Sequence, residues 1–138
     1  MDFGISKEEI IKALVEIPVW KGFDIAKRLE GQFKLCILSD QMQFKTDHIR
    51  QNNDLSLFDY IFFSSEIGVK KPSEKLFQMV LDKIKELPQN CLFIDDKIKN
   101  IEAAERLGFQ VIHCNNIDLL EQQISVLLYA TNNFQKTN

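Results

Sequence analysis

The stretch CLFIDDKIKNIEAAERLGFQVIHC, residues 91–114, decides the fold of this chain. A short apolar run ends at two adjacent carboxylates, Asp95 and Asp96, and is followed by a segment of helical periodicity that stops at Gly108. A second apolar run, residues 109–113, follows that glycine. Near-continuous apolar runs on either side of an amphipathic helix are typical of parallel strands that are covered on both faces. The stretch therefore predicts a strand–helix–strand unit with an acidic pair at the end of its first strand.

The same alternation continues upstream and downstream. Further apolar runs predict strands at residues 33–38 and 60–63, and helical patterns lie at residues 23–30, 44–52, 73–86 and 117–129. Strands that alternate with helices at this spacing favour right-handed parallel crossovers. We therefore predict an α/β fold with a doubly wound parallel sheet.

The beginning of the chain carries a helix signal. Ser6 and Glu9 have the spacing of a capping box, apolar residues follow on one face, and Pro18 gives a stop. This pattern predicts a helix over residues 6–17.

Composition bounds the class of protein. The chain has 138 residues, of which 45% are hydrophobic and 27% charged, as in one globular domain with a real core. We expect this domain to span residues 1–130, followed by a polar tail at 131–138. A net charge of -3 argues against a nucleic-acid partner, and the apolar runs are too short to cross a membrane. Three cysteines without a CxxC motif and a start unlike a signal peptide favour a reducing cytoplasm.

Polar side chains stand where several apolar runs stop. Ser39-Asp40 follows FKLCIL, Lys71 lies in the segment after residues 60–63, and Asp95-Asp96 follows CLFI. Because the carboxyl ends of parallel strands share one edge of the sheet, we expect an alcohol, an amine and two carboxylates to converge there. Each of these motifs alone is more often a turn, a surface loop or a helix start than a functional group. Together they predict a phosphate and metal site, although no carboxylate follows an apolar strand upstream of Ser39.

Three segments together resemble the second, third and fourth motifs of the haloacid dehalogenase (HAD) superfamily. They are KLCILSD, FDYIFFSSEIGVKKPSEKLF and CLFIDDKIKNIEAAERLGFQVIHC, and the resemblance runs over roughly residues 20–114. It implies a HAD-like Rossmannoid core and an activity of magnesium-dependent phosphatase type, which works through a phosphoaspartyl intermediate. The family's first motif, which carries the nucleophilic Asp, has no counterpart here. Its first, central strand and most of its cap are also expected to be missing, with residues 1–18 as a possible remnant of a helical cap.

The resemblance implies roles for the residues at the catalytic position. Ser39 would donate its hydroxyl to a phosphoryl oxygen, and Lys71 would neutralise charge on the phosphate. Asp40 stands where the family usually has Asn, and its negative charge is expected to weaken phosphate binding.

The metal position is implied in the same way. Asp95 and Asp96 would hold Mg²⁺, which prefers hard oxygen ligands. Asn100, one helical turn after Asp96, would orient the metal's ligands from behind.

Three functions follow from these residues. The first is a HAD-type hydrolase, a phosphatase for a small phosphorylated metabolite, that is truncated and inactive as this chain alone. The second is a noncatalytic binding module derived from the same fold. The third, a phosphoacceptor receiver domain, is excluded because receivers carry the acidic pair first and Lys-Pro last. The acidic pair also favours metal-dependent phosphatases over metal-free dehalogenases.

The missing strand has a consequence for the sheet. Its loss would leave two unpaired edges in the interior, at residues 33–38 and 91–94, with backbone groups that are costly to bury unsatisfied. We expect these strands either to pair with one another or to recruit a strand from an upstream fragment or a second copy. Marginal stability or self-association should follow.

Overall fold

A five-stranded parallel sheet forms the centre of the molecule. The computed structural model describes residues 9–12, 19–52 and 54–137. The strand order is β3-β2-β1-β4-β5, and every neighbouring pair is parallel. The predicted α/β class with a doubly wound parallel sheet is confirmed. The strands are β1 (Glu9–Lys12), β2 (Lys34–Ser39), β3 (Tyr60–Phe63), β4 (Leu92–Asp95) and β5 (Gln110–His113).

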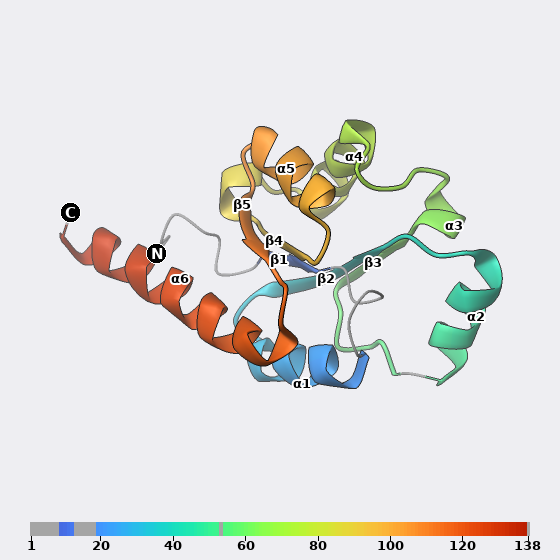
Figure 1. Ribbon diagram of the computed structural model, residues 1–138, viewed down its shortest axis with the longest axis horizontal. Helices are drawn as coiled ribbons and strands as arrows, with labels where there is room; N and C mark the ends of the chain where they lie inside the picture. The colour runs from blue at the N-terminus through green and yellow to red at the C-terminus, as the bar shows by residue number, and fades with distance from the viewer. Residues whose placement is uncertain (1–8, 13–18, 53, 138) are drawn as a thin grey trace.

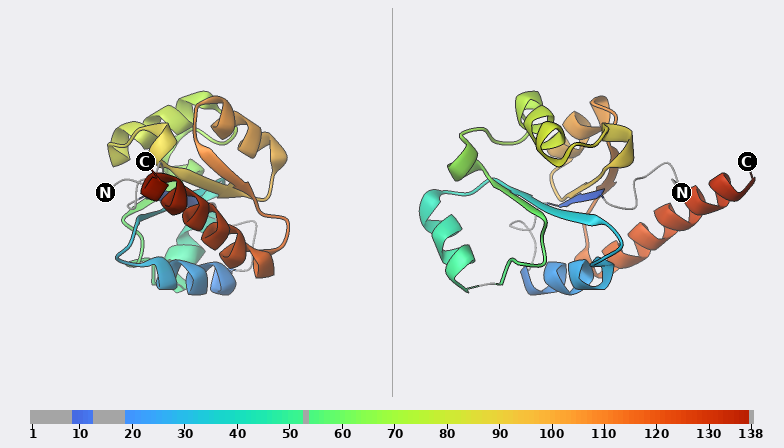
Figure 2. Two further views of the ribbon diagram at one scale, coloured as in Figure 1. Left: turned by 90° about the vertical axis from the view of Figure 1, so that its left-hand side faces the viewer. Right: turned by 180° about the vertical axis from the view of Figure 1, so that it is seen from behind.

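Helices cover both faces of the sheet. In Figure 1, α4 and α5 lie on one face, α1 and α6 lie on the other, and α2 and α3 stand beside the end of β3. Helix α6 is longer than predicted and takes in most of the expected polar tail; its second half extends away from the sheet (Figure 2). No helix in the described ranges is both long and apolar enough to cross a membrane. The helices are α1 (Val19–Leu29), α2 (Gln43–Asn52), α3 (Ser64–Ile67), α4 (Glu74–Ile84), α5 (Ile98–Arg106) and α6 (Ile117–Thr137), with a 3₁₀ turn at Pro88–Asn90.

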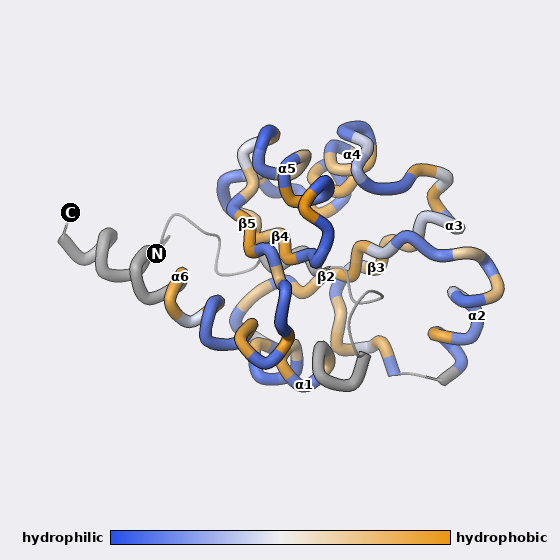
Figure 3. The backbone as a smooth tube through the Cα atoms, in the orientation of Figure 1, coloured by the Kyte–Doolittle hydropathy of each residue, from blue (hydrophilic) through white to orange (hydrophobic). Residues whose placement is uncertain are grey.

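Two apolar clusters, one on each face, hold the layers together. Successive residues of β2 alternate between them, because side chains along a strand point to opposite faces: Leu35 and Ile37 pack toward α1 and α6, and Cys36 and Leu38 pack toward α4 and α5. Figure 3 shows the apolar residues concentrated in the strands and the polar ones on the outer helix surfaces.

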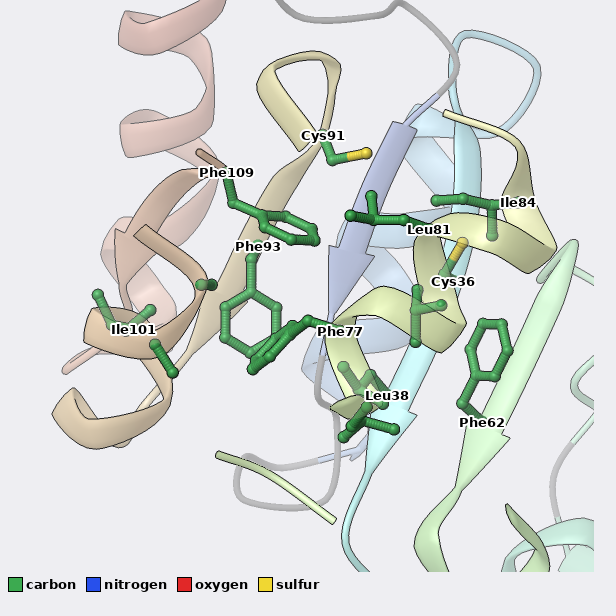
Figure 4. Close-up of a cluster of buried hydrophobic side chains, with 14 residues drawn as sticks. Cys36, Leu38, Phe62, Phe77, Leu81, Ile84, Cys91, Phe93, Ile101 and Phe109 are labelled. Atoms are coloured by element: carbon green, nitrogen blue, oxygen red, sulfur yellow. The ribbon is translucent and has the colours of Figure 1, made fainter. Parts of the chain in front are cut away.

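The cluster under α4 and α5 is built around aromatic rings. The ring of Phe77 meets that of Phe93 edge-on, with 5.2 Å between centroids, and Phe109 lies 5.6 Å from Phe77 (Figure 4). All three side chains are buried. Tilted contacts of this kind are the favoured geometry for aromatic pairs, so they fix how α4 sits on β4.

The centre of the sheet differs from the expectation. The helix predicted over residues 6–17 is wrong at Glu9–Lys12, which form β1, and the rest of that segment lies outside the described residues. Strand β1 pairs with β2 on one side and with β4 on the other. Its backbone therefore supplies the hydrogen bonds that β2 and β4 would otherwise lack. This requirement outweighs a local helix preference worth only tenths of a kcal/mol per residue, roughly.

The interior gap is thus filled by a strand from this chain. Direct pairing of β2 with β4 is not what the sheet shows, and no second chain is needed to close it. The position expected to lack the family's first strand holds the sequence EIIK. These four residues form the central strand of the sheet.

Candidate phosphate and metal site

The carboxyl ends of β2 and β4 bring polar groups to one edge of the sheet. Ser39 ends β2 and Asp95 ends β4, and both side chains are buried. Strand β1 lies between them. At about 4.8 Å per strand spacing, the two strand ends are roughly 10 Å apart. A group about the size of a phosphate with its metal ion can bridge such a distance.

Asp95 is the centre of a buried hydrogen-bond cluster. Its Oδ2 accepts from the Lys71 ammonium at 2.7 Å and from Asn100 Nδ2 at 3.1 Å. Its Oδ1 accepts from the backbone N–H of Lys97 at 2.8 Å. The exposed fraction is 0% for the Asp95 side chain and 2% for that of Lys71. Strand β4, the loop before α4 and the first turns of α5 thus meet at one carboxylate.

The pKa of Asp95 lies below its usual value of 3.8. Burial is the largest influence and favours the neutral acid. The charge of Lys71, the hydrogen bond from its ammonium, the hydrogen bond from the Lys97 N–H and a side-chain interaction with Asp96 together outweigh that penalty. Asp95 is therefore a carboxylate at neutral pH.

The loop that carries Lys71 is tied to the end of β2. Helix α3 ends at Gly68, whose φ of 78° is a left-handed conformation that glycine adopts without strain, and the chain then turns toward the sheet edge. The backbone N–H of Lys71 donates to Asp40 Oδ1 at 3.1 Å. The following Lys71–Pro72 peptide bond is cis. Asp40 thus holds the backbone of Lys71 while the ammonium reaches across to Asp95.

Ser39 and Asp96 occupy the expected strand ends. The Ser39 hydroxyl accepts a hydrogen bond from Gln41 Nε2 at 3.4 Å. Asp96 is half-buried, and its backbone carbonyl lies 2.9 Å from His113 Nε2, a contact that fixes the turn after β4 against the end of β5. Of the residues predicted from sequence, Lys71 and Asn100 both contact Asp95, and Asp40 contacts the backbone of Lys71. Ser39 and Asp96 lie at the same edge of the sheet.

Other polar residues of this edge were not predicted. Ser64 Oγ accepts from the backbone N–H of Gln41 at 2.9 Å, and the Thr46 and Ser65 hydroxyls lie 2.8 Å apart. The polar pair Ser64-Ser65 follows directly on the apolar strand β3, a signal that could have pointed to them. The contacts join residues 19 or more positions apart, so their partners could not be read from local spacing.

The donor set suits magnesium held through few protein ligands. Among the residues that the structure places, no group of three or more His, Cys, Asp or Glu side chains is arranged as a metal cage. Mg²⁺ commonly keeps several waters and binds one or two carboxylates together with phosphate oxygens. The adjacent carboxylates of Asp95 and Asp96 fit that pattern.

The resemblance to the family places the expected nucleophile at the end of the central strand. In the register of the sheet, Lys12 is level with Ile37 of β2 and Ile94 of β4. Asp95 therefore lies one position beyond the described register of β1. In the sequence, Lys12 is followed by Ala13, Leu14 and Val15, none of which carries a carboxylate.

Comparison with known proteins identifies the class. A sequence model of the haloacid dehalogenase-like hydrolases matches residues 6–108. An uncharacterized protein from Corynebacterium glutamicum is structurally similar, with a TM-score of 0.68, 24% identity, and coverage of 88% of this chain and 94% of that one. A HAD family enzyme from Bacteroides thetaiotaomicron, in complex with magnesium and inorganic phosphate, has a TM-score of 0.62 at 23% identity and covers 70% of this chain and 52% of its own. At these identities the likeness shows the fold alone.

Curated relatives match shorter segments. The sesquiterpene phosphatase astK of Aspergillus oryzae is 37% identical over 57 residues, 41% of this chain and 29% of the fungal protein. The D-ribitol-5-phosphate phosphatase of Bacteroides thetaiotaomicron is 29% identical over 70 residues, 51% of this chain and 34% of the bacterial one. This chain spans about a third or less of these relatives. The match to residues 6–108 shows that the chain belongs to the haloacid dehalogenase-like hydrolase family.

Proposed function

We propose that this chain provides the phosphate- and magnesium-binding part of a HAD-type phosphatase that acts on a small phosphorylated metabolite. The observation that carries the proposal is the buried cluster of Lys71, Asp95 and Asn100 at the carboxyl edge of the sheet. Phosphatase relatives support the reaction class. The fold of a neighbour that binds magnesium and inorganic phosphate supports the choice of ion.

In this proposal each residue of the chain binds or orients one part of the substrate. The Ser39 hydroxyl donates to a phosphoryl oxygen, and the Lys71 ammonium neutralises charge that grows on the phosphoryl group in the transition state. Asp95 and Asp96 would hold Mg²⁺, which supplies Lewis-acid stabilisation of phosphoryl oxygens. Asn100 keeps the Asp95 carboxylate in place through its hydrogen bond to Oδ2.

The covalent step needs a carboxylate at the end of the central strand, and none of the three residues that follow Lys12 in the sequence carries one. Supporting groups orient and stabilise a phosphoryl group but cannot accept it. We therefore propose that this chain alone does not turn over phosphomonoesters. A separate fragment with an acidic strand end could complete the site, but it would have to displace β1 from the central position.

A second candidate function is a noncatalytic module that binds phosphate and magnesium. The same register favours it, because β1 occupies the central position of the sheet and the three residues that follow Lys12 in the sequence carry no carboxylate. The three cysteines are buried and form no disulfide in the described part of the chain, which suits a reducing cytoplasm as the place of either function.

A phosphatase assay with magnesium and generic phosphomonoesters tests the proposal. We expect turnover indistinguishable from that of the Asp96→Ala variant, since neither protein has a nucleophile. Magnesium-dependent turnover that survives purification and that Asp96→Ala abolishes would contradict this and would require a substitute nucleophile in the chain.

A further inference from the structure

The Asp95 carboxylate has almost no capacity left for a metal ion. Each carboxylate oxygen accepts through about two lone-pair sites. Oδ2 already accepts from Lys71 and Asn100, and Oδ1 accepts from the Lys97 N–H. A cation that binds Asp95 must therefore displace one of these donors or use the last site on Oδ1.

Burial closes that remaining route. The Asp95 side chain has no exposed surface and that of Lys71 has 2%. A hydrated divalent ion cannot reach the carboxylate while the ammonium stays in place. The Lys71 charge also repels a second cation at hydrogen-bond range, and this repulsion is weakly screened in a dry site.

Of the three hydrogen-bond donors to Asp95, the Lys71 ammonium is the one that can move away most easily. The Lys97 donor is a backbone N–H at the start of α5, and Asn100 lies in the first turn of that helix with a short side chain. Lys71 reaches Asp95 through a flexible four-carbon stem, while Asp40 holds its backbone at the end of β2. The Lys71 ammonium can thus move while the backbone of its loop stays in place.

A phosphoryl group gives the ammonium a better partner. A phosphate monoester carries close to two negative charges near neutral pH, against one on Asp95. Ser39, the expected phosphoryl ligand, ends the strand that Asp40 follows, so the anion would sit on the side from which Lys71 is anchored.

We propose that the Lys71 ammonium pairs with the Asp95 carboxylate in the ligand-free protein. When a phosphoryl group binds, the ammonium moves to that group, which frees Asp95 for magnesium. Magnesium and phosphate then bind cooperatively, because each removes an obstacle to the other. This inference rests on the proposed function, since it assigns both ligands to the same edge of the sheet.

Magnesium titrations of the purified chain by calorimetry, with and without inorganic phosphate, test the inference. In the unmodified protein, phosphate should raise the magnesium affinity about tenfold, within the usual range for coupled ligands. Lys71→Met should bind magnesium about tenfold more tightly without phosphate, and added phosphate should no longer matter. The matched control, Lys70→Met, removes the exposed neighbouring charge and should behave like the unmodified protein.

The outcomes separate the two proposals. Magnesium affinity that is independent of phosphate, or a Lys71→Met variant that binds magnesium no more tightly than Lys70→Met, would overturn the cooperative exchange alone. If neither ligand binds to any variant, the proposed function fails as well.

A second measurement covers the case in which Lys71→Met does not fold. In the unmodified protein, the Lys71 ¹⁵Nζ resonance reports on its ion pair. Phosphate should shift it toward a new position, and an unchanged resonance at saturating phosphate would overturn the exchange.

Discussion

The ion pair of Lys71 and Asp95 has a structural cost and a proposed function. Removing two charges from water costs several kcal/mol per ion, roughly, and a well-packed apolar pair is often as stable as a buried ion pair. Stability alone therefore gives little reason for this pair at a 0% exposed position. The proposed binding of an anion and a cation at this site gives a better reason for the pair.

Removing one partner of the pair should be costly. We expect Lys71→Ala to lower the free energy of unfolding by about 3–5 kcal/mol, because it leaves the Asp95 charge buried and unpaired. Urea unfolding followed by circular dichroism measures this loss. Lys70→Ala, which removes an exposed charge, should change the free energy by less than about 0.5 kcal/mol. Equal effects of the two substitutions would contradict the burial of the pair.

The lowered pKa of Asp95 gives the stability a defined dependence on pH. The folded protein binds this proton less readily than the unfolded chain does, so the carboxylate contributes stability above its ordinary pKa of 3.8. This contribution is lost as the pH falls through the lower pKa of the folded state. We expect the difference in unfolding free energy between the unmodified protein and Asp95→Asn to be constant from pH 7 to 5 and to shrink below about pH 4. A difference that grows on acidification would contradict a lowered pKa.

Individual residues were predictable from sequence where a strand end marked them. Asp95, Lys71 and Asn100 follow from apolar runs and helical spacing, and the structure places them in contact. The hydrogen bond from the backbone of Lys71 to Asp40 was not predictable, because it joins residues 31 positions apart. It gives Asp40 a positioning role in place of the purely repulsive one that its charge suggests.

Among the secondary-structure elements, β1 is where local pattern and tertiary context disagree. Residues 6–17 have apolar residues at helical spacing, whereas Glu9–Lys12 pair with strands on both sides. The other strands were predicted to within one residue at each end, since their runs are buried on both faces and have no helical alternative of similar length. An element whose structure depends on two distant strands cannot be read from its own sequence.

Deleting residues 1–12 should expose the inner edges of β2 and β4. Unpaired parallel edges with apolar faces invite pairing with another chain, so we expect concentration-dependent self-association of the deletion variant. Sedimentation velocity at several concentrations measures it. The unmodified chain and a variant that lacks residues 131–138 serve as controls and should sediment as monomers.

Hydrogen exchange on the same proteins locates the change. The amides of β2 and β4 should be strongly protected in the unmodified chain and should lose protection in the deletion variant wherever it is monomeric. Equal protection in both proteins would mean that β2 and β4 pair without β1.

Over the whole molecule, the class of the fold was more predictable than the segment that occupies the central position of the sheet. Alternating strands and helices predicted the parallel sheet. Because the carboxyl ends of parallel strands share one edge, the sequence also predicted where the polar groups meet. The filling of the central position by the chain's own N-terminal segment could not be derived from pattern, because it follows from the backbone hydrogen bonds that β2 and β4 need.

We propose that this edge of the sheet binds a phosphoryl group with magnesium but cannot accept it covalently. A ³¹P NMR titration of phenyl phosphate with magnesium and the purified chain tests both parts at once. We predict that the ester resonance shifts or broadens with added protein, that Lys71→Ala abolishes this effect, and that no inorganic phosphate signal grows over many hours. An ester resonance unaffected by the protein, or a magnesium-dependent phosphate signal that Asp96→Ala removes, would contradict the account.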